Sequence, residues 1–242
     1  MSRPHSQVVY RGPSRFDPAE TIRAVLVLRS RNRKTGDMAQ LYVLHDNIPP
    51  TDAQATGHDS AVCGACPLRP ANSGGCYVVT CQGPLSTWKA TNGHAVSPWL
   101  ETVEALKGRA LRLGAYGDVA ALPADLVRAL ASAVDLRITG YTHGHRLLGM
   151  DGVSHLRGLC MLSVESPAEA RAAAAAGWRY FRTRPENSPT LAGEIQCPFE
   201  RVECTNCLLC RGTASGPGVK SISVEVHGSR VSRALNVIQV ER

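Results

Sequence analysis

Aromatic residues are scarce in this chain of 242 residues, where Phe, Trp and Tyr together make up 5%. Proteins that bind single-stranded nucleic acid without sequence preference stack successive bases on aromatic side chains. So few rings argue against an extended stacking surface of that kind. The tryptophans show no spacing typical of a nucleotide cage, and we expect them to be packing residues.

Long apolar runs are also absent. No stretch of eighteen apolar residues occurs, and the chain does not open with the apolar segment of a signal peptide. We therefore expect no membrane partner and a cytoplasmic location. In that reducing compartment thiols are kept for metals rather than for disulfides. This matters because the chain contains nine cysteines.

The basic residues do not form a block. The formal net charge is +7 and the isoelectric point is about 9.1. Such a charge is compatible with an anionic partner, such as a nucleic acid or a nucleotide. Because the arginines are dispersed along the chain, composition alone does not locate a binding surface, and it gives no signal of the oligomeric state.

Four of the cysteines lie within fourteen positions, in "CPFERVECTNCLLCRG". A single zinc ion usually draws paired ligands from two separated segments, whereas cysteines two residues apart suit an iron–sulfur cluster. Cys197, which precedes Pro198, is the expected fourth ligand beside Cys204, Cys207 and Cys210. We call these four residues the late cysteine set and predict that they hold a 4Fe-4S cluster, with zinc as the alternative.

A second group lies upstream, in "AVCGACPLRPANSGGCYVVTCQGP". Cys63 and Cys66 form a CxxC pair, Cys76 follows, and Cys81 comes five residues later. If all four bind, the site is closed and either structural zinc or a fully ligated cluster fits. If only the first three bind, one iron of a cluster stays open for a substrate or cofactor. The sequence leaves both possibilities open; we call Cys63, Cys66 and Cys76 the first cysteine set.

Strands and helices are expected to alternate over most of the chain. The patterns predict strands over 24–30, 39–47, 109–118, 135–145, 156–166 and 178–184, and helices over 97–108, 122–134 and 166–178. Such alternation predicts parallel pairing through right-handed crossovers. The expected fold is α/β, a partial (β/α) barrel with a cysteine-rich metal-binding loop and a C-terminal cluster segment.

Three regions are expected along the chain. Residues 1–20 are polar and carry three prolines, which indicates an N-terminal arm. Residues 21–190 would form the partial barrel, including the cysteine loop 60–84, and 191–242 the cluster segment with the last strand. The stretch 48–84 shows no long periodic pattern, and an irregular loop of that length usually has a function or a metal to organise it.

Polar side chains follow each predicted parallel strand, at the end where α/β proteins gather their chemistry. They are Tyr116, Asp118, Tyr141, Thr142, His143, Ser163, Glu165, Arg182, Arg184 and His227. Simpler roles compete with a shared pocket. Asp118 can cap the next turn, and His143 can lie in a solvated loop. Cys160, within an apolar strand, is expected to be a core residue.

The motifs "CGAC…CY", "RLGAYGD", "GYTH", "CMLSVES", "GWRYFRTR", the CP dipeptide before CxxCxxC, and "VEVHG" occur in this order between Ser60 and Gly228. This order resembles a family of uncharacterised proteins of bacteriophages and prophages. The layout of that family is similar to radical S-adenosylmethionine (SAM) enzymes, although the usual CxxxCxxC loop of those enzymes is absent here.

The resemblance implies a radical-SAM-like fold and specific roles. The first cysteine set would hold a 4Fe-4S cluster with an open iron, and the late set an auxiliary cluster. The segment Tyr116, Gly117 and Asp118, together with Ser163, would bind SAM.

Two functions from different classes follow. In the first, the chain is an atypical radical SAM enzyme that receives electrons from a donor protein and acts on an unknown substrate, with a nucleic acid or nucleotide as a candidate. Asp118, His143 and Glu165 would then position SAM or the substrate as the catalytic residues. In the second, both cysteine groups are closed structural sites, and the chain is a non-catalytic module that binds nucleic acid or protein.

Overall fold

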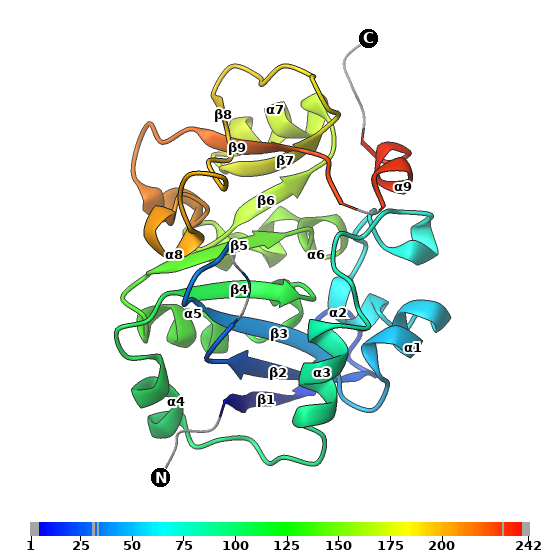
Figure 1. Ribbon diagram of the computed structural model, residues 1–242, viewed down its shortest axis with the longest axis vertical. Helices are drawn as coiled ribbons and strands as arrows, with labels where there is room; N and C mark the ends of the chain where they lie inside the picture. Colours follow the sequence, from blue (N-terminus) through cyan, green and yellow to red (C-terminus); the bar gives the residue numbers. More distant parts are fainter. Residues whose placement is uncertain (1–4, 31, 33, 229, 239–242) are drawn as a thin grey trace.

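The computed structural model describes residues 5–30, 32, 34–228 and 230–238. The strands among these residues form one nine-stranded sheet (Figure 1). The strands are β1 (Ser6–Pro13), β2 (Thr21–Val27), β3 (Ala39–His45), β4 (Leu111–Tyr116), β5 (Ile138–Thr142), β6 (Met161–Val164), β7 (Tyr180–Arg184), β8 (Glu194–Gln196) and β9 (Ser221–Glu225). The α-helices are α1 (Pro50–Thr56), α2 (Ser60–Cys63), α3 (Gly83–Ala90), α4 (Trp99–Leu106), α5 (Ala124–Ser132), α6 (His145–Gly152), α7 (Pro167–Ala175), α8 (Cys204–Cys207) and α9 (Val231–Leu235). Short 3-10 turns are η1 (Pro70–Asn72), η2 (Val119–Ala121), η3 (Ser154–Leu156) and η4 (Gly212–Ser215).

The strand order is β1-β2-β3-β4-β5-β6-β7-β9-β8. The pairs β1–β2 and β2–β3 are antiparallel, and every pair from β3 onward is parallel. The prediction of a mixed α/β fold with a largely parallel sheet is therefore confirmed. The sheet is open, with β1 and β8 at its edges, and does not close into a barrel. The resemblance of this fold to that of radical SAM enzymes in particular stays a prediction.

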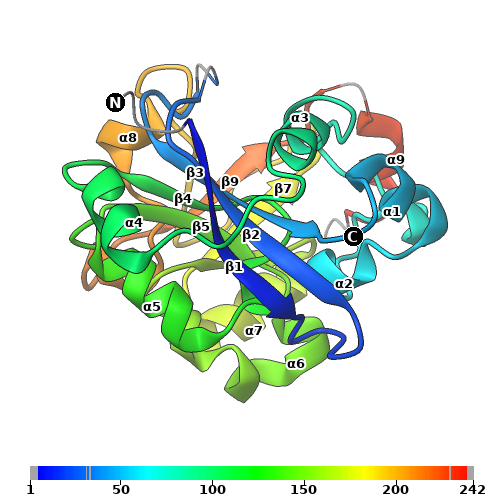
Figure 2. The same ribbon diagram turned by 90° about the horizontal axis from the view of Figure 1, so that it is seen from below.

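Helices α4, α5, α6 and α7 lie along one face of the sheet (Figure 2). Helix α7 begins as the sequence predicts, because the Ser166 hydroxyl accepts a hydrogen bond from the Glu169 N–H at 3.1 Å. Helices α1, α2 and α3 gather instead at the carboxyl ends of the parallel strands, to the right in Figure 1. No helix within the described ranges is long and apolar enough to cross a membrane.

Two stretches differ from the prediction. The region 1–20 is expected to be a loose arm, but Ser6–Pro13 forms β1, with Val8 buried and paired with Val25 of β2. The region 48–84 is expected to be irregular, but it contains α1, α2, η1 and the start of α3. These helices are too short to repeat an apolar pattern, which explains why periodicity misses them.

Cys160 and Trp178 are core residues, as predicted. Cys160 is fully buried, and a side chain at Gly140 would have its Cβ 2.7 Å from the Cys160 sulfur. Trp178 is 5% exposed, but Trp99, also expected to pack, is 42% exposed at the start of α4.

A buried ion pair ties the edge strand β8 to the interior. Arg182 donates from Nε and Nη2 to the two carboxylate oxygens of Glu194, each at 2.7 Å. Both side chains are almost entirely out of solvent. Removing one partner of such a pair is costly, since it leaves the other charge buried and uncompensated.

We predict that Glu194→Gln lowers the free energy of unfolding by about 3 kcal/mol, because the Arg182 guanidinium loses its counter-charge. Urea denaturation at neutral pH measures this change. The double variant Arg182→Met/Glu194→Met should recover much of the loss, because it removes both charges together.

The matched control is Asp125→Asn, which removes the acidic partner of the exposed i,i+3 pair with Arg128 and should leave stability unchanged. Burial alone would raise the pKa of Glu194, but hydrogen bonds from Arg182 and the Leu191 N–H outweigh it and lower that pKa. The stabilisation is therefore present above the unfolded carboxyl pKa of about 4.3 and is lost as the pH falls through the lower folded value. Glu194→Gln should therefore lower stability less as the pH falls below the folded pKa of Glu194. An equal loss of stability at neutral pH and below that pKa would contradict the ion pair between Arg182 and Glu194.

Candidate metal centres

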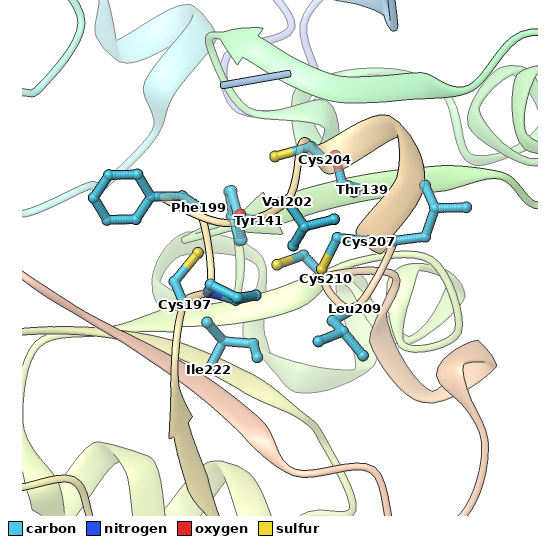
Figure 3. A pocket seen from close by; sticks show the side chains of 12 residues that line it. Thr139, Tyr141, Cys197, Phe199, Val202, Cys204, Cys207, Leu209, Cys210 and Ile222 are labelled. Carbon is cyan, nitrogen blue, oxygen red and sulfur yellow. The ribbon is translucent and has the colours of Figure 1, made fainter. Parts of the chain in front are cut away.

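The late cysteine set lines one pocket (Figure 3), beside α8, which lies across the sheet from α5 and α7 (Figure 2). Cys197 follows β8, Cys204 and Cys207 are the first and last residues of α8, and Cys210 lies buried beyond it. In Figure 3 the side chains of Cys197, Cys207 and Cys210 point into the same space, with Cys204 at its edge. The four thiols thus line one pocket, and the prediction that they bind one metal group stays a prediction.

A buried arginine holds the chain around Cys210. Arg179, 7% exposed, donates to the carbonyls of Leu209 (2.6 Å) and Gly212 (2.9 Å) from one nitrogen, and to those of Val219 and Lys220 from the others. These carbonyls are spread over twelve positions of the chain, from Leu209 to Lys220. One guanidinium therefore holds that loop against the start of β7.

Gly212, in the same loop, lies where a side chain would not fit. Its φ is +62°, and a Cβ there would lie 2.5 Å from the Arg157 carbonyl oxygen and 2.6 Å from that of Cys160. A residue with a side chain would push the loop off the sheet. The Cys210 carbonyl also accepts from the Gly140 N–H of β5 at 3.1 Å, which fixes the last thiol of the set against the central strands.

Burial favours the neutral thiol at Cys197, Cys204 and Cys210. It raises the pKa of Cys210 to about 12, and it raises the pKa of Cys197 and of Cys204 as well. Arg112 opposes the shift at Cys204, and Lys34 opposes it at both Cys197 and Cys204. Metal binding here would release protons, because the thiolate is the ligand form.

The first cysteine set lies at the carboxyl ends of β3, β4 and β5, on the loop that contains α2 and η1. Burial raises the pKa of Cys63 well above its usual value, and the charges of neighbouring Cys66 and Cys76 raise it further. Cys81 is exposed. Of the other three upstream cysteines, Cys66 and Cys76 therefore lie near enough to Cys63 to act on it electrostatically.

A buried ion pair supports this loop. Arg69 bonds to the buried carboxylate of Asp59 and also donates to the carbonyls of Gly57 and Gly64. Asp59 in turn accepts the Cys63 N–H through its own carbonyl at 2.8 Å. The pair therefore connects both ends of α2 to the segment that carries Cys66.

The C-terminal helix α9 packs on the other end of the loop. A Cβ on Gly75 would lie 2.5 Å from the Ala234 nitrogen and 2.6 Å from the Arg230 carbonyl oxygen. The Arg230 guanidinium also donates to the Cys76 carbonyl at 3.3 Å. Residues more than 150 positions apart therefore hold Cys76 in place.

The end of β4, predicted to bind a cofactor, lies against the first cysteine set. Tyr116 is 3% exposed, and its hydroxyl is buried without a hydrogen-bond partner. Burial raises the pKa of Tyr116 well above its usual value, with Cys63, Asp59 and Cys76 acting in the same direction, so the hydroxyl remains a donor. Gly117 is needed for close packing, since a Cβ there would lie 2.5 Å from the Val43 carbonyl oxygen.

These features fit a sulfur-bound metal group. The donor set consists of thiols, which are the ligands of iron–sulfur clusters and of zinc. A protonated hydroxyl without a partner, close to Cys63 and Cys76, is suited to donate to a sulfur atom of such a group.

Asp118 organises the loop rather than facing open space. Its carboxylate accepts from the Ala120 N–H (2.9 Å), the Thr142 hydroxyl (2.8 Å) and the His143 N–H (2.7 Å). Burial raises the pKa of Asp118, although these hydrogen bonds oppose the shift. The capping role that the sequence offered as an alternative is present, and Asp118 joins the ends of β4 and β5.

His143 and Glu165 meet beside the first cysteine set. The His143 Nε2 lies 2.6 Å from Glu165 Oε1, and the ring also contacts the Cys66 thiol. Burial disfavours the imidazolium, but Cys66 and Glu165 outweigh it and raise the pKa of His143 well above its usual value. Arg146 donates to both Glu165 and Glu169, which compensates the buried carboxylate. The solvated loop is therefore the wrong interpretation of His143.

The other predicted residues are placed as follows. Ser163 lies buried on β6, one strand away from the end of β5. Arg182 and Arg184 are engaged with Glu194 and Glu225, respectively. Across the described part of the chain, no three His, Cys, Asp or Glu side chains lie close enough together to hold one metal ion. The metal assignments of both cysteine sets stay predictions.

Sequence reasoning missed the arginines that build these sites, namely Arg69, Arg146 and Arg179. Arg69 and Arg179 bind largely to backbone carbonyls, which carry no signature in sequence. Arg146 lies in the first turn of α6, and its partners Glu165 and Glu169 come from the next strand–helix unit, so local spacing does not reveal it.

No family model, no curated protein and no solved structure matches this chain.

We predict that Cys76→Ser removes the metal of the first cysteine set, whereas Cys81→Ser leaves it in place. Cys76 lies with Cys63 and Cys66, but Cys81 is exposed. Iron, zinc and acid-labile sulfide in anaerobically purified variants measure the difference.

Cys160→Ala is the matched control, because it removes a buried thiol from the core without touching either cysteine set. Loss of metal on Cys81→Ser, comparable to the loss on Cys76→Ser, would show that the site is closed by four thiols.

Proposed function

We propose that this protein is an iron–sulfur protein with two clusters, and that it acts as an atypical radical SAM enzyme on a substrate still to be identified. The observation that carries the proposal is that Cys66 and Cys76 lie near enough to Cys63 to raise its pKa, on a loop at the carboxyl edge of parallel strands, whereas Cys81 is exposed. Ligand sites of parallel α/β sheets lie at that edge.

The position of the cysteine loop supports the proposal. The loop follows β3, the first strand of the parallel part of the sheet, and the Tyr116–Asp118 segment follows β4 beside it. The Asp118 N–H donates to the Val62 carbonyl at 2.7 Å, so the two segments are joined next to Cys63. Two motifs that the resemblance associates with one cofactor thus share one place in the fold.

The first cysteine set would hold the open cluster through its three thiolates. When bound, such a cluster supplies an iron without a protein ligand and an electron for the reductive cleavage of SAM. The Tyr116 hydroxyl would donate to a sulfur of the group, and Asp118 would keep the ends of β4 and β5 in register. Ser163 would contact SAM.

His143 and Glu165 would act as a coupled pair next to Cys66. The carboxylate orients the ring, and the ring donates toward the sulfur, so a proton is held at His143 close to the metal ligand. Hydrogen-bond partners of this kind tune a metal site and restrict the geometry of its ligands.

The late cysteine set would hold a second cluster with all positions filled by protein. Four thiols line its pocket, and apolar side chains such as Leu209 and Ile222 surround them. An electron donor protein would be needed for catalysis. The late set would serve as an auxiliary site in that scheme.

A non-catalytic module remains the second candidate. Its support is the extent of the scaffold around the cysteines, since Arg69 and Arg179 would equally well serve metal sites whose role is to staple loops. In that case zinc or closed clusters hold the loops, and the basic surface binds nucleic acid or a partner protein.

The composition of the purified protein separates the two candidates. We expect about eight irons per chain with matching sulfide after anaerobic purification, and an electron paramagnetic resonance spectrum of the reduced protein that changes on addition of SAM. With a strong reductant, 5′-deoxyadenosine should form. One or two zincs with little iron, or an unchanged spectrum and no cleavage of SAM, would favour the module and reject the enzyme.

A second prediction concerns His143. We expect His143→Gln to lower the rate of 5′-deoxyadenosine formation by about 10- to 100-fold, because the partner of Cys66 is lost. Iron content should stay close to that of the unaltered protein. His94→Gln, at an exposed histidine, is the control and should change neither quantity. An unchanged rate for His143→Gln would remove this residue from the mechanism.

A further inference from the structure

Lys34 lies where four separate segments meet. It comes from the loop between β2 and β3, and its Nζ is 3.1 Å from the Tyr77 hydroxyl and 3.0 Å from Nε2 of His227. It also lies over the ring of Phe199, 4.5 Å from the centroid. We call Lys34, Tyr77, Phe199 and His227 the Lys34 junction.

The hydrogen bonds at this junction leave donors free. The His227 Nδ1 lies 2.7 Å from the Glu225 carbonyl, which only accepts, so the proton is on Nδ1 and Nε2 accepts from Lys34. Tyr77 also accepts from Lys34. An ammonium group has three N–H donors, so one N–H of Lys34 and the O–H of Tyr77 remain to bind a further acceptor.

Lys34 has no carboxylate partner within the described ranges. Its partners are a phenol, an imidazole nitrogen and aromatic rings, and it also lies near enough to Cys197 and Cys204 to lower their pKa. Two adjacent donors, one of them an ammonium group, are suited to a phosphate group.

The aromatic part of the junction is accessible. Tyr77 is 57% exposed, which is unusual for so large a ring. Its edge packs on His227 at 4.9 Å between centroids, and His227 stacks on Phe199 at 5.7 Å with an angle of 10°. A supported, exposed ring is a stacking surface for one base, in keeping with a chain too poor in aromatics to stack many.

We propose that the Lys34 junction binds one nucleotide, with its phosphate on Lys34 and the Tyr77 hydroxyl and its base on the Tyr77 ring. The nucleotide is either free or an unpaired unit of a strand, since the chemistry is the same. Tyr77 follows Cys76 and Phe199 follows Cys197 by two positions, so the bound nucleotide would lie between the two cysteine sets. Its role as the substrate rests on the proposed function, but its binding does not.

Binding is measured on the protein as purified, without reductant or SAM. The probes are AMP, adenosine and inorganic phosphate by calorimetry, and a fluorescein-labelled single strand of about twelve nucleotides by anisotropy. We expect Lys34→Met to weaken AMP or strand binding about tenfold. For the strand, the slope of log K against log salt should fall by about 0.7, the value for one phosphate contact.

The second variant, Tyr77→Leu, should weaken AMP about tenfold but leave inorganic phosphate nearly unchanged, because only the stacking surface is lost. Lys107→Met, at an exposed lysine at the end of α4, is the control and should bind as the unaltered protein does. Binding of AMP alone identifies a free nucleotide as the source of the phosphate, and binding of the strand alone identifies an unpaired unit of nucleic acid.

Metal content and thermal stability are recorded for each variant. Should Lys34→Met unfold the loop, cross-linking of a 5-bromouracil strand to the unaltered protein still tests the site, with Tyr77 or Phe199 as the expected attachment points. Failure of both AMP and the strand to bind, equal binding by Lys34→Met, or cross-links elsewhere would overturn the proposal. Iron content and SAM cleavage are separate readouts, so either proposal can fail while the other stands.

Discussion

The order of the parallel strands is the constraint on which the rest of the structure depends. Because β3, β4, β5, β6, β7 and β9 are neighbours in chain order, the loops that follow them emerge at one edge. The thiols of the first cysteine set, the Tyr116 hydroxyl and the His143–Glu165 pair come from segments about one hundred residues apart and meet there. A sheet with a different strand order would scatter these groups.

Three buried carboxylates lie at that edge, and arginines compensate two of them. Asp59, Asp118 and Glu165 are all buried, and a buried carboxylate without partners is strongly unfavourable. Arg69 compensates Asp59, Arg146 compensates Glu165, and Asp118 is met by three donors. Arg69 lies on the loop that carries the first cysteine set, and the ring of His143 contacts the Cys66 thiol, so this charge network adjoins that set.

Much of this could be predicted from sequence where local patterns suffice. Apart from α6, the strands and α-helices between 97 and 184 follow from periodicity and from caps such as Ser166, and spacing singles out the cysteines that line one pocket. Interactions with distant backbone could not be predicted. Arg179 binds carbonyls 30 to 41 positions away, and β1 depends on pairing with β2, which outweighs the prolines around it. Whether a parallel sheet closes is likewise decided by strand twist and by its edges, which single residues do not encode.

The contact between α9 and the first cysteine set bears on how the protein matures. Gly75 lies against the backbone of Ala234, and Arg230 holds the Cys76 carbonyl, although the cysteines themselves belong to the first third of the chain. During synthesis these thiols leave the ribosome long before the helix that encloses them. The loop can therefore be enclosed only after translation has passed α9, and until then its thiols stay open to metals and to oxidants.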